Sequence, residues 1–181
     1  MQFIEETPRL ILKVENEDKA QDILDFYLRN RDHISPFEPQ VSDSFYTLTY
    51  QQKMLDYEFQ QIMKGTTIRY YIYLKSDPTN IIGSVNLTGI VHGPFCKAVL
   101  GYKLDQSMVG YGYASEAVTH LLSLAANDLK LHRIEAHVVT HNQPSIRLLN
   151  NIGFRYEGIE YQSTKVDGQW QDLLRYSLIL N

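Results

Sequence analysis

The chain has 181 residues, of which 44% are hydrophobic and 21% are charged, and its net charge is −4. This length and composition predict one globular domain over residues 1–181, and the negative charge argues against a direct nucleic-acid partner, which requires a basic face. The single cysteine excludes an internal disulfide, and the absence of a signal peptide and of an apolar run near ~18 residues predicts a cytoplasmic protein with no membrane partner.

The first half of the chain is predicted to contain helices followed by a run of strands. Apolar residues recur at helical spacing after a first strand-like segment, and three strand-like runs then follow one another. Short turns between consecutive strands imply an antiparallel meander. In chain order we expect a strand at 9–14, a helix at 18–31, a rigid proline-rich loop at 35–39, a helix at 47–64, and strands at 67–75, 81–91 and 97–104 with turns at 77–80 and 92–94.

The second half alternates helix and strand. The strand–helix–strand unit from Leu100 to Val139 should be parallel and right-handed. A meander joined to one parallel βαβ unit, with helices packed on the sheet, makes a mixed α/β (α+β) sheet the predicted fold class. The expected elements are a helix at 113–129, a strand at 133–139, a helix at 144–152, and strands at 154–162 and 170–180 joined at 166–168.

The most informative segment is the glycine turn between the strand at 97–104 and the helix at 113–129, which reads Val109-Gly110-Tyr111-Gly112-Tyr113-Ala114. A strand that enters a helix through such a turn directs unpaired N–H groups and the positive end of the helix dipole to one point. The turn therefore predicts a phosphate cradle. The chain has no Gly-Lys-Ser/Thr for a P-loop, and Ser115 stands where a dinucleotide fingerprint has its third glycine.

This turn resembles the pyrophosphate-binding loop of the GNAT acetyltransferase superfamily, Q/R-x-x-G-x-G/A, with Val109 in place of its first residue. The rest of the chain is similar to the RimJ/RimL branch, whose members acetylate protein N-termini, including those of ribosomal proteins. The resemblance implies a GNAT-like fold. The matching segments are His132–Ala136, Asn142–Phe154, Glu157-Gly158, Asp167–Asp172 and the loop at Phe37-Glu38-Pro39.

The resemblance also implies a site for acetyl-CoA, the acetyl donor, between two splayed strands and without a metal. The glycine turn would hold the pyrophosphate, and a backbone N–H at the strand edge would stabilise the oxyanion that forms on the thioester. From the residues alone, Leu104 could equally be a plain core residue and Asn142 a helix cap. The implied cofactor-binding residues are Lys103, Leu104, Val109, Gly110, Tyr111, Gly112, Tyr113, Ala114, Ser115 and Asn142.

Ser145 is the implied acid that returns a proton to the leaving thiolate. Many GNAT enzymes use a tyrosine of the same helix, but the matching residue here is Leu149, which cannot donate. A serine in the first turn of a helix can also serve as a cap, so both roles stay open for Ser145.

The general base is less defined. The RimL-like pattern has a glutamate where this chain has Thr164, which leaves Glu38, Glu160 and Asp172 as candidates, and we assign Glu38. An α-amine, with a pKa near ~7.7–8.0, is partly neutral at pH 7, whereas lysine, near ~10.4, is not. An N-terminal acceptor therefore needs little help from a base.

These observations predict an acetyl-CoA-dependent N-acetyltransferase that acts by direct attack in a ternary complex on a protein or peptide N-terminus. The alternatives are a small-amine acetyltransferase and a non-catalytic CoA-binding module, which the departures at Val109, Leu149 and Thr164 keep open. Because His137 and His141 do not share a helix face, no metal site is predicted. The oligomeric state, monomer or homodimer, is left open.

Overall fold

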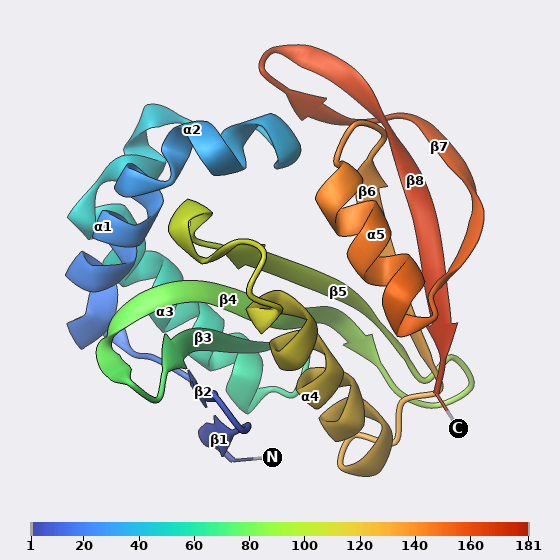
Figure 1. The fold of residues 1–181 in the computed structure, drawn as a ribbon, viewed down its shortest axis with the longest axis horizontal. Helices are drawn as coiled ribbons and strands as arrows, with labels where there is room; N and C mark the ends of the chain where they lie inside the picture. The colour runs from blue at the N-terminus through green and yellow to red at the C-terminus, as the bar shows by residue number, and fades with distance from the viewer. Residues whose placement is uncertain (1, 181) are drawn as a thin grey trace.

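The protein is described by a computed structural model over residues 2–180, with one eight-stranded sheet at its centre (Figure 1). The strand order is β1-β2-β3-β4-β5-β6-β8-β7. The strands are β1 (Ile4–Glu6), β2 (Leu10–Lys13), β3 (Ile68–Leu74), β4 (Asp77–Val91), β5 (Lys97–Leu104), β6 (Arg133–Val139), β7 (Arg155–Val166) and β8 (Gln169–Ile179). The helices are α1 (Ala20–Arg29), α2 (Arg31–Ile34), α3 (Leu48–Met63), α4 (Tyr113–Asn127) and α5 (Gln143–Ile152), with short 3-10 turns at η1 (Glu17–Lys19), η2 (Ser35–Phe37), η3 (Asp43–Tyr46) and η4 (Gln106–Met108).

The topology confirms the predicted mixed sheet. Strands β1 to β5 form an antiparallel meander. Strands β5 and β6, which precede and follow α4 in the sequence, are parallel neighbours in the sheet. The parallel pairing covers only Lys97–Val99 of β5 and Arg133–Glu135 of β6. Both strands continue past this short ladder, and they diverge beyond it, so the sheet opens between them (Figure 1).

The two faces of the sheet carry separate hydrophobic clusters, because successive strand residues point to opposite faces. On one face, α4 and α5 cover a large core that includes Ile134, Ala136 and Val138 of β6. On the other face, α1 and α3 cover a smaller core built around Tyr71 and Tyr73 of β3. The opening between β5 and β6 therefore connects two differently lined sides of the molecule.

Two of the expected elements are placed differently from the prediction. The turn predicted at 77–80 is wrong, since β4 already begins at Asp77 and the chain reverses at 75–76. Pairing of β4 with β5 begins at Gly83, which lies opposite Leu104. Pro78 precedes this ladder and lies on a free edge of β4, where its missing N–H removes no ladder hydrogen bond. The helix expected at 18–31 is divided into η1, α1 and α2.

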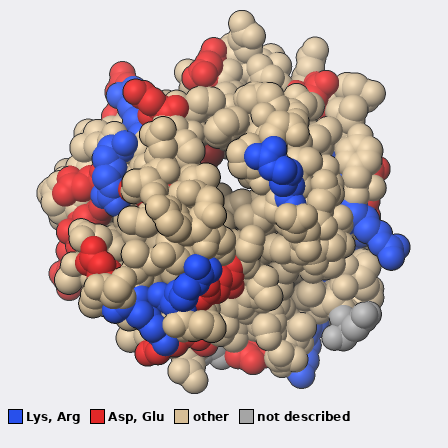
Figure 2. Space-filling model, in the orientation of Figure 1, with Lys and Arg blue, Asp and Glu red and all other residues tan. Residues whose placement is uncertain are grey.

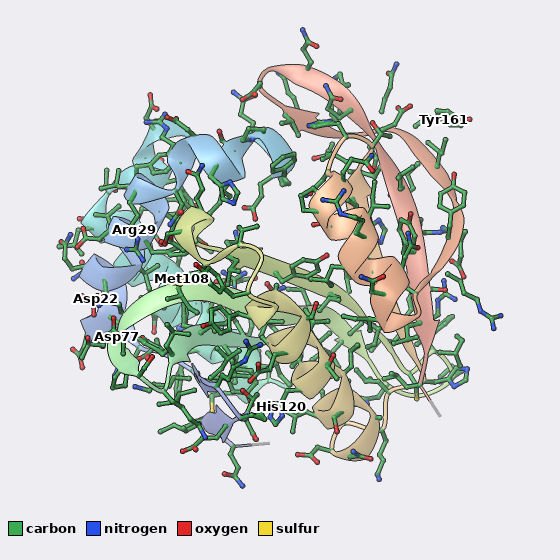
Figure 3. The ribbon with its side chains drawn as sticks, in the orientation of Figure 1. Asp22, Arg29, Asp77, Met108, His120 and Tyr161 are labelled. Atoms are coloured by element: carbon green, nitrogen blue, oxygen red, sulfur yellow. The ribbon has the colours of Figure 1, made fainter. Side chains whose placement is uncertain are left out.

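Strand β1 was not predicted from the sequence. It is three residues long and pairs with β2 at the edge of the sheet. Glu5 of this strand lies 3.3 Å from Nε2 of His120 on α4, a residue labelled in Figure 3. Such a short strand depends on contacts that are distant in sequence. Within residues 2–180, no helix combines the length and the apolar character needed to span a bilayer.

Candidate active site

A cavity of about 950 Å³ lies where β5 and β6 diverge, and Figure 2 shows a hollow at the centre of this face of the molecule. Its walls come from both strands, the loop before α4, the start of α5 and the segment after α2. Tyr111 is the one predicted site residue that does not line it, and it is 62% exposed. The predicted residues that do line it are Glu38, Lys103, Leu104, Val109, Gly110, Gly112, Tyr113, Ala114, Ser115, Asn142 and Ser145.

The loop before α4 has a shape that favours glycine. Gly110 and Gly112 have φ angles of +91° and +80°, and this left-handed region costs other L-residues about 1–2 kcal/mol. The Glu116 N–H donates to the Gly112 carbonyl oxygen, so the N–H groups of residues 113–115 precede the helical ladder. These donors lie at the cavity wall with the positive end of the α4 dipole, as a phosphate cradle requires. The N–H of Val109 is not among them, because it donates to Gln106.

Arg9, which directly precedes β2 and is about 100 residues away in the sequence, holds this loop in place. Its Nη1 donates to the Tyr111 carbonyl oxygen at 2.9 Å, and its Nε donates to the Glu116 carboxylate at 2.6 Å. Its guanidinium also lies 4.6 Å from the centre of the Tyr113 ring. Burial alone would raise the pKa of Glu116, but hydrogen bonds from Thr7 and Arg9 lower it, so the carboxylate stays charged. Arg9 thus supports the loop in which Val109 departs from the family pattern.

Asp105 ties the end of β5 to α1. Its carboxylate accepts hydrogen bonds from Arg29 at 2.7 Å and Asn30 at 2.9 Å, and it caps η4 through Ser107. Burial raises the pKa of Asp105, but these hydrogen bonds outweigh burial and hold it well below the usual range. Figure 3 shows Arg29 and Met108 of η4 at this junction. The loop is therefore anchored at both ends, by Asp105 before it and by Arg9 after it.

The end of β5 forms one wall of the cavity. Leu104 packs against the core beneath α4, and Lys103 points to the opposite face. Gly83 of β4 allows β5 to approach closely, since a Cβ there would lie 2.4 Å from the Lys103 carbonyl oxygen. Beyond Val99 the other edge of β5 has no parallel partner in β6. Main-chain groups on this open edge are available to a bound molecule.

The first turn of α5 forms the opposite wall. Asn142 caps the helix, because its Oδ1 accepts a hydrogen bond from the Ser145 N–H at 3.2 Å. The Ser145 side chain lies at the cavity wall beside Tyr102, and its hydrogen bond to Tyr102 lowers the pKa of that phenol. The Tyr102 hydroxyl donates to the Ser145 carbonyl oxygen at 3.4 Å, and burial raises the pKa of Tyr102 to about 12. Leu149 is fully buried in the core.

Charged side chains line the cavity on the α1 face. The Lys103 ammonium donates to Glu38 at 2.6 Å, and its side chain is 13% exposed. Burial alone would lower the pKa of Lys103, but Glu38 raises it above its usual value. Arg69 pairs with Glu58 at 2.7 Å, and its buried Nε has no hydrogen-bond partner within residues 2–180. Protonating Glu38 would leave a buried ammonium unpaired, so this geometry argues against Glu38 as the base.

The other two base candidates, Asp172 and Glu160, differ in their position relative to the cavity. Asp172 accepts a hydrogen bond from the Gln162 N–H and does not line the cavity. Glu160 lies 3.0 Å from Nδ1 of His137, and His137 does line the cavity. Among the described residues, no group of three or more acidic, histidine or cysteine side chains is arranged to hold a metal ion.

Sequence reasoning missed Arg9, Arg69, Tyr102 and His137 as parts of this site. For Tyr102 and His137 a signal was present, because strand alternation places each on a defined face of β5 or β6. For Arg9 and Arg69 no local pattern was available, since their roles come from ion pairs with the helical residues Glu116 of α4 and Glu58 of α3.

Comparison with known proteins identifies what shares this architecture. Residues 9–155 match the acetyltransferase (GNAT) domain family. The chain is 35% identical over 153 residues to the probable N-acetyltransferase YjcK of Bacillus subtilis, which covers 84% of each protein. It is 32% identical over 168 residues to the ribosomal protein uS5-alanine N-acetyltransferase of Escherichia coli, covering 92% of this chain and 85% of that enzyme.

A solved structure shows the same fold with a bound ligand. RimJ of Mycobacterium smegmatis, in complex with CoA-disulfide, superposes with a TM-score of 0.88 at 26% identity. The superposition covers 94% of this chain and 81% of that one.

Proposed function

The chain belongs to the GNAT family of acetyl-CoA-dependent N-acetyltransferases, and we propose that its acceptor is the α-amine of a protein or peptide N-terminus. The observation that carries the proposal is the cavity between β5 and β6. One side of it is the phosphate cradle, and the other side, which we call the acceptor groove, is lined by Glu38, Arg69 and Lys103. A ternary complex needs both compartments, one for the thioester and one for the amine.

In this proposal the N–H groups at the start of α4 bind the pyrophosphate of CoA, and Ser115 lies beside them. The pantetheine arm runs between the open edge of β5, at Lys103 and Leu104, and Asn142. The capping bond of Asn142 uses its Oδ1, so its amide nitrogen remains a donor for the arm. RimJ of Mycobacterium smegmatis, which shares the fold, was solved with a CoA derivative.

The reaction is direct attack of the amine nitrogen on the thioester carbonyl. A backbone N–H of the β5 edge stabilises the oxyanion, which is the largest single effect in many acyl transfers. The carbon–sulfur bond then breaks, and the Ser145 hydroxyl returns a proton to the thiolate. A thiolate, with an ordinary pKa near ~8.5, leaves readily and needs only a weak donor.

The groove favours an N-terminal acceptor over a polyamine. Its acidic side chain Glu38 is already paired with Lys103, and Glu58 is paired with Arg69. A polycation would therefore meet carboxylates that are already neutralised, whereas a peptide presents carbonyl oxygens behind its single amine. The relative from Escherichia coli acts on the alanine of a ribosomal protein, and a ribosomal acceptor would place the reaction in the cytoplasm.

The proposal is tested by measuring thiol release from acetyl-CoA with matched acceptors. These are a peptide with a free N-terminal alanine, the same peptide with its N-terminus blocked and an internal lysine, and spermidine. We expect turnover with the first peptide alone. Turnover with spermidine alone would assign a small-amine acceptor, and no turnover with tight CoA binding would assign a non-catalytic module.

A further inference from the structure

We infer that His137, held in place by Glu160, is the general base that takes the proton from the attacking amine. The inference rests on the proposed function, because it assigns a residue to the same reaction. It replaces Glu38, whose carboxylate is already bonded to the Lys103 ammonium.

The position of His137 follows from the alternation of β6. Ala136 and Val138 pack into the core beneath α4 and α5, so His137 between them points to the opposite face. That face carries Lys103 and the acceptor groove. The last parallel pair is Val99 with Glu135, and extending this register places His137 level with Gly101, just inside the opening.

The bond to Glu160 fixes which nitrogen of the ring is free. Nδ1 of His137 lies 3.0 Å from Oε2 of Glu160, and a carboxylate acceptor requires that Nδ1 carry the hydrogen. The neutral ring then has its lone pair on Nε2. Nε2 has no hydrogen-bond partner within residues 2–180. Because Glu160 lies on β7, the edge of the ring that carries Nε2 is turned away from β7, toward β5 and the cavity.

The surrounding charges support this pairing. Each other carboxylate near His137 has its own cationic partner: Glu135 pairs with Lys97 and Arg133, Glu157 with Arg133 and Arg175, and Glu38 with Lys103. Among the described residues, Glu160 has His137 as its one ion-pair partner. Its second bond is neutral, from the Ser163 hydroxyl at 3.2 Å. The charged groups on the same face as His137 are thus Lys97, Lys103, Arg133, Glu135, Glu157, Glu160, Arg175 and Glu38.

The proton balance is complete with these groups. The amine nitrogen forms a bond to the thioester carbon and gives one proton to Nε2, directly or through one water. The carbon–sulfur bond breaks, and the thiolate takes a proton from Ser145. The imidazolium then releases its proton to solvent, which restores the neutral ring, and the serine takes a proton back from solvent, so that both residues are ready for the next cycle.

An imidazole suits an α-amine better than a lysine. Free histidine has a pKa near ~6.5, close to the ~7.7–8.0 of an α-amine and far from the ~10.4 of lysine. General bases work best when their pKa is near the operating pH. The residue therefore agrees with the proposed class of acceptor.

The first test compares His137→Gln with the wild type. We expect kcat to fall on the order of 10²-fold, with the Kd for CoA unchanged by calorimetry. In the wild type, protonation of the imidazole should lower kcat/KM on the acid side of the pH profile. In His137→Gln this ionisation should be missing, and only the ionisation of the acceptor amine should remain. His92→Gln, the same exchange in the exposed β4–β5 turn, is the control and should match the wild type.

The second test separates chemistry from structure. His137→Ala should regain activity when free imidazole is added, in proportion to the neutral form of imidazole. Glu160→Gln should lower kcat by about 10-fold yet keep the imidazole ionisation in the pH profile, as a positioning residue does.

Two results would overturn the inference. One is a His137→Gln enzyme with wild-type kcat/KM across the pH range. The other is a His137→Ala enzyme that binds CoA normally but gains nothing from imidazole. Both leave the proposed function intact, whereas a wild-type protein that acetylates no α-amine would refute that function itself.

Discussion

At the scale of single residues, Arg9 has the clearest structural role in the glycine turn before α4. It bonds the Tyr111 carbonyl oxygen, pairs with Glu116 and stacks on Tyr113. Its side chain is 48% exposed, so the ion pair alone is weak in water. The main effect of Arg9 is to hold the loop in one conformation, because its three contacts act on the loop together.

Replacing Arg9 with Gln should therefore weaken CoA binding more than it lowers stability. We expect about a 10-fold rise in Kd, equivalent to ~1.4 kcal/mol, in a calorimetric titration with CoA. Lys13→Gln removes a cation of β2 that lies over Tyr73, and it should leave the Kd unchanged. An Arg9→Gln protein with wild-type affinity would show that the loop keeps its shape without this contact.

Ser145 and Tyr102 meet at the start of α5, and both carry hydroxyl groups. Because the Tyr102 hydroxyl donates its proton to a carbonyl oxygen and Ser145 lies at the cavity wall, we expect Ser145→Ala to lower kcat by about 10- to 100-fold. Tyr102→Phe should change kcat far less. Steady-state kinetics with saturating acetyl-CoA distinguishes them, and a larger loss in Tyr102→Phe would reverse the assignment.

At the scale of elements, the loop–α4 junction depends on backbone conformation. Gly112 at φ +80° and Gly93 at φ +74° share the left-handed region, but Gly93 lies in the remote β4–β5 turn. Alanine at either position should cost about 1 kcal/mol of folding stability. Only Gly112→Ala should also raise the Kd for CoA. Equal binding by both variants would place the phosphate site elsewhere.

Strands β6, β7 and β8 are joined by Glu157, which bonds Arg133 and Ser177. The hydrogen bonds from Arg133 and Ser177 lower the pKa of Glu157 to about 2. A glutamate in an unfolded chain titrates near ~4.3, so the folded state binds fewer protons between these values. The stabilisation is present above pH ~4.3 and is lost as the pH falls toward 2.

Urea unfolding as a function of pH measures this contribution. The wild-type midpoint should fall as the pH decreases from ~4.5 to 2, and Glu157→Gln should show a smaller fall over the same range. Glu17→Gln, in the exposed turn η1, is the control and should keep the wild-type slope. Parallel curves for Glu157→Gln and the wild type would remove Glu157 from the acid-sensitive groups.

At the scale of the whole molecule, the sequence predicted the mixed sheet and the position of the cleft. Residues 97–104 and 133–139 were predicted as strands with the bounds that the structure shows, because strong apolar alternation and glycine or proline punctuation are local signals. The glycine turn before α4 was predictable for the same reason.

What escaped prediction depends on contacts between distant segments. Glu5 of strand β1 contacts His120 on α4, more than 100 residues away in the sequence. The start of β4 at Asp77 lies on an edge that the distant strand β5 does not cover. In the site, the His137–Glu160 pair joins β6 to β7 across β8. No window of the sequence contains both partners, so tertiary packing decides these features.

The central claim is that this cleft transfers acetyl groups to N-terminal α-amines. The direct measurement is to incubate the protein with isotopically labelled acetyl-CoA and a bacterial ribosomal protein fraction, and to locate the label by peptide mass spectrometry. We predict label on the α-amine of one or a few N-terminal residues. Label confined to lysine side chains, or none above a reaction without the protein, would contradict it.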